Sequence, residues 1–269
     1  MRTSRIFLVS ALAPALAAAA LTLAAAPALA HFGMIIPSQD TVADKAKAKA
    51  KVELAVSFSH PMEGNGMDMA KPKAFGVVDN GQKTDLLPAL KPAKVMDHAA
   101  WTAEYTFKKP GVGTFFLVPE PYFEPAEDKF IEHLTKVTVP AFGEEEGWDA
   151  PVGLAAEIVP LTRPFGNYAG NVFTGKLLVD GKPAAEVLVE VEFYNKDKAY
   201  EAPNEYMTAQ VVKTDANGVF SYAVPFAGWW GFAALVDAPE TLQKDGAAKK
   251  VERGAVLWAK FLEPKRNKK

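Results

Sequence analysis

Short segments in which apolar and polar residues alternate recur along most of the chain, and no other feature constrains the fold as much. A period of two places successive side chains on opposite faces of a β-strand, whereas a helix needs apolar residues every three or four positions. Almost no stretch shows a sustained helical period. The sequence therefore predicts an all-β protein.

Two sets of candidate strands can be read from this alternation and from runs of β-branched and aromatic residues. The first set covers residues 52–58, 101–107, 114–118 and 130–139, and the second covers 171–179, 187–194, 207–214, 219–224, 231–236 and 255–261. Asn80-Gly81 and Asp180-Gly181 predict hairpin turns, because these residues tolerate positive φ angles. Evenly spaced short strands with tight turns are typical of β-sandwiches.

The acidic, glycine- and proline-containing stretch 143–151 lies between the two sets and indicates a linker or a long surface loop. We therefore predict two immunoglobulin- or prealbumin-like β-sandwich domains in tandem. The first, residues 31–158, would carry the functional site. The second would span residues 159–264, with residues 265–269 as a basic tail.

The first thirty residues have the layout of a signal peptide. Arg2 and Arg5 precede a long apolar run, and Ala28-Leu29-Ala30 suits a signal peptidase. The alternative is an uncleaved membrane anchor, since the apolar run approaches the length of a span; Pro14 and the many alanines argue against it. Cleavage before His31 would give an exported, periplasmic protein, and no later segment is long enough to span a bilayer.

Charge and cysteine content exclude several classes. The chain has 30 Lys and Arg against 32 Asp and Glu, and removal of Arg2 and Arg5 makes it more acidic still, so no nucleic-acid partner is expected. It contains no cysteine, which excludes disulfides, cysteine nucleophiles and zinc-cysteine sites. No serine elbow, phosphate-binding loop or zinc-protease helix motif occurs, so the sequence does not indicate an enzyme. Glu124 and Glu127 lie in a proline-containing stretch and are expected to be solvated.

Histidine is then the informative residue, and all four histidines lie in the first half of the chain. His31 would become the first residue after cleavage, where its α-amine and imidazole Nδ1 can close a chelate ring on a metal ion. His60 ends a predicted strand just before Pro61, and Glu63 follows in the same loop. His133 shares a strand face with Ile131 and Thr135 and is as well explained by a buried core position as by ligation.

These residues define the predicted metal site as His31, His60 and His133, with Glu63 as a fourth or outer ligand. His98 resembles an exposed loop residue and ranks last. Nitrogen ligands alone do not choose between Ni²⁺, Cu²⁺ and Zn²⁺, and five clustered methionines (Met34, Met62, Met67, Met69 and Met96) also raise copper.

Four stretches resemble the exported NikK-like nickel-uptake accessory proteins that are encoded beside energy-coupling-factor nickel transporters. They are His31-Phe32-Gly33-Met34, the loop from Phe58 to Glu63, residues 120–131, and residues 160–171. The resemblance implies a periplasmic protein that binds Ni²⁺ and presents it to a membrane-embedded transporter, with His31, His60 and His133 in matching stretches. Met62 departs from the pattern, because an aromatic residue is expected there.

Three functions stay open at this point. The first is a non-enzymatic nickel-binding protein whose second sandwich is a spacer or docking module. The second is a copper histidine-brace protein, either copper-binding or oxidative, because an N-terminal histidine plus another histidine is also the signature of that site. The third is a metal-free structural or adhesive sandwich protein.

Overall fold

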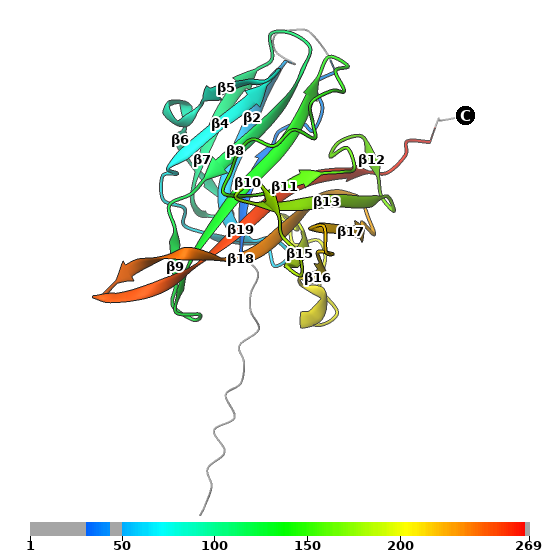
Figure 1. Ribbon diagram of the computed structural model, residues 1–269. Coiled ribbons are helices and arrows are strands. Elements are labelled where there is room, and N and C mark those ends of the chain that lie inside the picture. The colour runs from blue at the N-terminus through cyan, green and yellow to red at the C-terminus, as the bar shows by residue number, and fades with distance from the viewer. Residues whose placement is uncertain (1–30, 44–49, 267–269) are drawn as a thin grey trace, which may run out of the picture.

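The computed structural model describes residues 31–43 and 50–266, and it is built from β-strands (Figure 1). Within these residues the only helices are two short 3₁₀ turns, η1 (Leu87–Ala89) and η2 (Glu205–Met207). The strands of the first half are β1 (Phe32–Pro37), β2 (Lys51–His60), β3 (Asn65–Met67), β4 (Ala74–Asp79), β5 (Gln82–Asp85), β6 (Lys91–Val95), β7 (His98–Thr106), β8 (Gly111–Val118), β9 (Tyr122–Glu124) and β10 (Lys129–Ala141). Those of the second half are β11 (Ala156–Pro160), β12 (Asn167–Tyr168), β13 (Val172–Val179), β14 (Lys182–Pro183), β15 (Leu188–Phe193), β16 (Gln210–Lys213), β17 (Val219–Ala223), β18 (Gly228–Lys244) and β19 (Ala247–Leu262).

One sheet of ten strands runs through both halves. Its main order is β16-β15-β18-β19-β10-β8-β4-β5, and the halves meet where β10 pairs in parallel with β19. A five-stranded sheet (β1, β2, β3, β6, β7) belongs to the first half, and a four-stranded sheet (β11, β13, β14, β17) belongs to the second. The two halves therefore share hydrogen bonds along a common sheet.

The two smaller sheets cover opposite faces of the large one. Along β19, Val256 and Trp258 belong to one hydrophobic core, whereas Ala255 and Leu257 belong to the other. Successive strand residues point to opposite faces, so the cores lie on the two sides of the ten-stranded sheet. The first core is completed by side chains of the five-stranded sheet, including Phe32 and Leu54, and the second by side chains of the four-stranded sheet, including Ile158 and Phe173.

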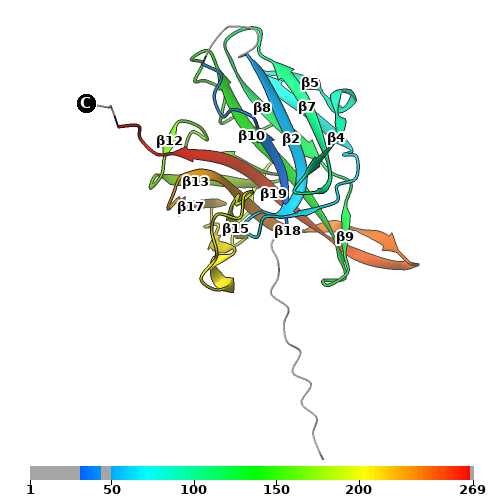
Figure 2. The same cartoon turned by 180° about the vertical axis from the view of Figure 1, so that it is seen from behind.

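The predicted all-β class and sandwich packing are confirmed, and both predicted hairpin turns are present, with φ of 51° at Asn80 and 49° at Asp180. Three strand predictions need correction. Residue 207 lies in η2, so strand β16 begins only at Gln210. The strands expected at 231–236 and 255–261 are much longer, and they form one hairpin that projects from the body (Figures 1 and 2).

The tandem-domain boundary at residue 158 stays a prediction, although β11 straddles it and pairs with β13 of the second half. The stretch 44–49, residues 267–269 of the basic tail and the predicted signal peptide lie outside the described residues. Within the described part of the chain, neither 3₁₀ turn is long and apolar enough to cross a membrane.

Candidate metal centre

His31 and His60 lie side by side where β1 begins and β2 ends. The two strands are antiparallel, with Phe32 opposite Ser59, so the preceding and following residues are brought together. The ring centroids of His31 and His60 are 4.5 Å apart, with the planes inclined by 52°. His31 is only 7% exposed, and His60 is partly buried. The structure thus pairs the two histidines that the sequence ranks highest.

Glu124 of β9 places a carboxylate beside His31. Its Oε2 lies 3.0 Å from Nε2 of His31, and its side chain is 13% exposed. The expectation that Glu124 is solvated is therefore wrong: β9 pairs with the start of β10, which holds the Tyr122–Glu124 segment against the sheet. Glu127 fits the expectation better, since it lies in the exposed turn after β9 and forms an ion pair with Lys129.

The protonation of His31 reflects these neighbours. Burial lowers its pKa below the ordinary value of 6.5, and the adjacent His60 lowers it further. Glu124 and Glu127 act in the opposite direction, but they do not cancel the effect of burial. The imidazole is therefore held in its neutral form near pH 7, which is the form that binds metal ions.

Aromatic side chains pack against His31 on the side that faces the protein interior. Phe58 stacks on His31 with ring centroids 5.6 Å apart, and Tyr122 lies 6.2 Å from the same ring. A cavity of about 180 Å³ adjoins them, and Met69 and His133 also contribute to its lining. The centre therefore has an apolar inner side.

His133 is buried within this inner side. Its Nδ1 accepts a hydrogen bond from the Gly33 N–H at 3.3 Å, which fixes the proton of the neutral ring on Nε2. Burial, with smaller effects from His31 and Lys129, lowers its pKa to about 3. Nε2 has no hydrogen-bond partner among the described residues and lies against Gly254, where an added Cβ would come within 2.8 Å of it. In this arrangement His133 holds β1 through the Gly33 N–H.

The remaining candidates, Glu63 and His98, each contact a neighbouring polar side chain. Glu63 accepts a hydrogen bond from the side chain of Asn65 at 3.1 Å, and no contact in the described part of the chain joins it to His31. His98 is exposed, as expected, and its Nδ1 is 3.3 Å from Asp68. Within residues 31–43 and 50–266, no three histidine, aspartate or glutamate side chains are already arranged to hold a metal ion.

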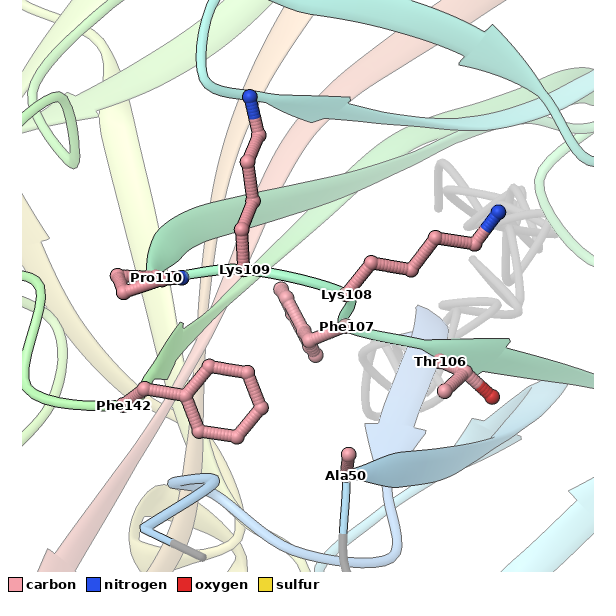
Figure 3. A pocket seen from close by; sticks show the side chains of 7 residues that line it. All are labelled: Ala50, Thr106, Phe107, Lys108, Lys109, Pro110 and Phe142. Atoms are coloured by element: carbon pink, nitrogen blue, oxygen red, sulfur yellow. The ribbon is translucent and has the colours of Figure 1, made fainter. Parts of the chain in front are cut away.

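A larger cavity, about 740 Å³, lies at the other end of the first core (Figure 3). Phe107 and Phe142 border it, and Lys108 and Lys109 extend away from its centre. Ala50 and Thr106 on its rim are next to the first residues of β2, whereas His60 is the last residue of that strand. A strand of this length separates the two places by roughly 30 Å, so the cavity has no part in the histidine pair.

Glu124 could have been found from one sequence signal. Tyr122 and Glu124 are two positions apart and so share a strand face, which gives a carboxylate and an aromatic ring on the same side. Pro121 and Pro125 conceal the signal, because prolines at both ends of so short a segment argue against a strand.

Comparisons with known proteins give a family and little beyond it. A family model described as "Domain of unknown function (DUF4198)" matches residues 28–238. No curated protein matches the chain. Similar solved structures include the D0-D1 domain of Intimin (13% identity, covering 85% of this chain and 99% of that one, TM-score 0.22). Others are a bacterial ice-binding adhesin (13%, 87% and 65%, TM-score 0.24) and the fibronectin(III)-like modules of Clostridium thermocellum CbhA (12%, 88% and 100%, TM-score 0.21). TM-scores this low carry no argument about this chain.

Proposed function

The chain belongs to the DUF4198 family, and we propose that it is an exported, non-enzymatic protein that captures Ni²⁺ at its mature N-terminus. The ion would then pass to a membrane-embedded nickel transporter. The capture step is argued from the histidine pair. The transport step and the periplasmic location rest on the resemblance to NikK-like accessory proteins and on the signal-peptide layout of residues 1–30.

One observation carries the capture step: Nε2 of His31 is 3.0 Å from the carboxylate of Glu124. Metal-binding histidines almost always direct their second ring nitrogen to a carboxylate, carbonyl or water, which fixes the ring and its tautomer. With Nε2 turned to Glu124, Nδ1 is the nitrogen left on the side of the main chain. That nitrogen forms a six-membered chelate ring with the α-amine of an N-terminal histidine.

The proposed ligands are the α-amine and Nδ1 of His31, together with an imidazole nitrogen of His60. Glu124 orients His31 and His133 supports the strand from within the core, while Glu63 stays a predicted fourth or outer ligand. The α-amine has an ordinary pKa of about 7.7–8, so a metal ion can displace its proton near neutral pH. The low pKa of the His31 ring removes a second competing proton.

The same ligands would also suit a copper histidine brace, so copper is the main competitor. Copper binds most nitrogen sites more tightly than nickel, and binding strength alone therefore does not decide which ion is carried. Among the clustered methionines, Met34 has its sulfur engaged inside the protein: Sδ is buried and accepts a hydrogen bond from the Ser59 hydroxyl.

The proposal is tested by titrating metal-free protein, starting at His31, with Ni²⁺ and with Cu²⁺ in a calorimeter. We expect one Ni²⁺ per chain, and we expect His31→Ala and His60→Ala each to weaken it at least tenfold, about 1.4 kcal/mol. His98→Ala is the matched control and should bind as the unsubstituted protein does. Absence of any divalent-ion binding would leave the metal-free structural role. Oxidation of a polysaccharide by the copper-loaded protein, with reductant and oxygen, would support the oxidative alternative.

A further inference from the structure

We propose that Asn195, in the second half of the chain, is a positioning residue for the metal site and holds the His60 loop (residues 60–66) in its binding position. The inference rests on the proposed function, because it concerns the same histidine. It also changes the role of the second half, which would be part of the site and not only a spacer or docking module.

Asn195 follows β15 and reaches the loop through both its main chain and its side chain. Its backbone N–H donates to the carbonyl of Pro61 at 3.0 Å, and its Nδ2 donates to the carbonyl of Met62 at 2.9 Å. These two carbonyls belong to the residues directly after His60. Asn195 is 3% exposed, so water does not readily substitute for these hydrogen bonds.

The same side chain is held from the other side by the turn that follows it. Nδ2 also donates to the carbonyl of Tyr200 at 2.7 Å, and Oδ1 accepts from the Tyr200 N–H at 3.2 Å. Nδ2 therefore donates two hydrogen bonds and Oδ1 accepts one, and the contacts with Tyr200 brace the turn of residues 195–200. A side chain fixed in this way by hydrogen bonds can hold the Pro61 and Met62 carbonyls in one position.

Two further contacts tie the loop to the second half. The Met62 N–H donates to Oε2 of Glu192 at 3.0 Å, and Nζ of Lys198 donates to Oδ1 of Asn65 at 2.9 Å. Gly64 packs so closely that an added Cβ would come within 2.8 Å of the Asn195 carbonyl. The loop thus lies on the segment from Glu192 to Tyr200 along most of its length.

The position of His60 depends on this support for a local reason. His60 is the last residue of β2, and Pro61 has no N–H with which to continue a ladder. In the five-stranded sheet, the residues after Pro61 pair with β2 again only through the three-residue strand β3, in which Asn65 lies opposite His60. Loss of the Asn195 hydrogen bonds would let the loop move, and a ligand displaced by about 1 Å no longer fits a preorganised metal site.

The experiment compares Asn195→Ala with Asn171→Ala in the mature protein. Asn171 is a matched control, because it lies in the same half and its side chain accepts a backbone hydrogen bond from Tyr168. Ni²⁺ affinity is measured by calorimetry, and the visible spectrum of the Cu²⁺-loaded protein reports the geometry of the ligands. Amide hydrogen exchange of residues 60–66 is measured without metal.

We expect Asn195→Ala to lower Ni²⁺ affinity at least tenfold, to shift the Cu²⁺ spectrum and to speed exchange across the loop, while Asn171→Ala changes none of these. Unchanged affinity and spectrum in Asn195→Ala would overturn the inference, as would equal losses in both variants. If the unsubstituted protein binds no metal, the proposed function fails. The exchange data then decide whether Asn195 holds the loop: equal exchange in both variants overturns that too.

Discussion

The His60 imidazole affects the protonation of His31, which makes the neighbours of His31 testable one residue at a time. His60→Ala removes an influence that lowers the pKa of His31, so that pKa should rise. Glu124→Gln removes an influence that raises it, so the pKa should fall. NMR titration of the His31 ring in the metal-free protein measures both. Shifts of the same sign in the two variants would contradict the described geometry.

His133 makes a separate prediction about stability and pH. Its pKa is about 3 in the folded protein, against an ordinary value of 6.5. Between these values the unfolded chain binds a proton that the folded chain does not, so His133 costs stability as the pH falls from about 6.5 toward 3. The free energy of unfolding should fall by up to about 1.4 kcal/mol per pH unit relative to His133→Gln, which cannot take up this proton.

Urea unfolding of both proteins without metal, at several pH values from 7 to 4, provides the measurement. Curves of unfolding free energy against pH that run parallel for the two proteins would show that His133 is not buried in its neutral form.

At the level of single residues, the sequence predicts part of the candidate site. It predicts His31 and His60 as ligands because one follows the predicted cleavage site and the other ends a strand before a proline. It does not distinguish His133 as a ligand from His133 as a buried residue, since strand alternation gives the face and not the depth. Glu124 is missed because its contact with His31 joins segments about ninety residues apart, and no local rule specifies that distance.

Strand β1 is held in place by Trp258 of β19, and this contact carries a prediction at the level of elements. The indole Nε1 donates to the carbonyl of Gly33 at 2.9 Å, and the ring packs against Phe32. Trp258→Phe should cost about 1–3 kcal/mol of unfolding free energy and should speed amide exchange in β1. Trp230→Phe is the matched control, because its Nε1 donates to the Phe226 carbonyl at 3.0 Å in the other core.

The control should lose comparable stability while leaving exchange in β1 and Ni²⁺ affinity unchanged. If Trp258→Phe also leaves amide exchange in β1 and Ni²⁺ affinity unchanged, β1 is positioned by its pairing with β2 and not by the indole.

Strand existence is read well from the sequence, and strand length is read poorly. The alternating segments 52–58 and 130–139 correspond to β2 and β10 with small changes at the ends. In contrast, residues 237–254 carry many charges and were not expected to be strand, yet they form the outer part of the β18–β19 hairpin. Charged side chains fit there because this part is largely exposed and forms ion pairs such as Lys249 with Asp128.

The shared ten-stranded sheet joins the two halves, and we therefore expect them to unfold as one cooperative unit. The first core includes Ala233, Val256 and Trp258 from the second half, and the second core includes Phe116 and Leu134 from the first. Calorimetry of residues 31–269 should therefore show a single unfolding transition whose calorimetric and van't Hoff enthalpies agree. Residues 31–158 produced alone should not unfold cooperatively. Two separate transitions would contradict this account and favour independent sandwiches.

This arrangement could not be predicted from the sequence, because the parallel pairing of β10 with β19 joins residues about 120 positions apart. Turn residues and the alternation of apolar and polar side chains indicate local structure, and they do not determine which distant strands pair. Sequence reasoning therefore gives the class and the two sets of strands, and the structure adds the sheet that unites them.

The central claim is that removal of residues 1–30 creates a metal ligand, the α-amine of His31. Calorimetric titration with Ni²⁺ of the chain that starts at His31, against the same chain with one alanine added before it, tests this most directly. The added residue converts the amine to an amide and keeps every side chain. We predict that it weakens binding at least tenfold, about 1.4 kcal/mol. Equal affinities would contradict the claim, because the chelate would then play no part in binding.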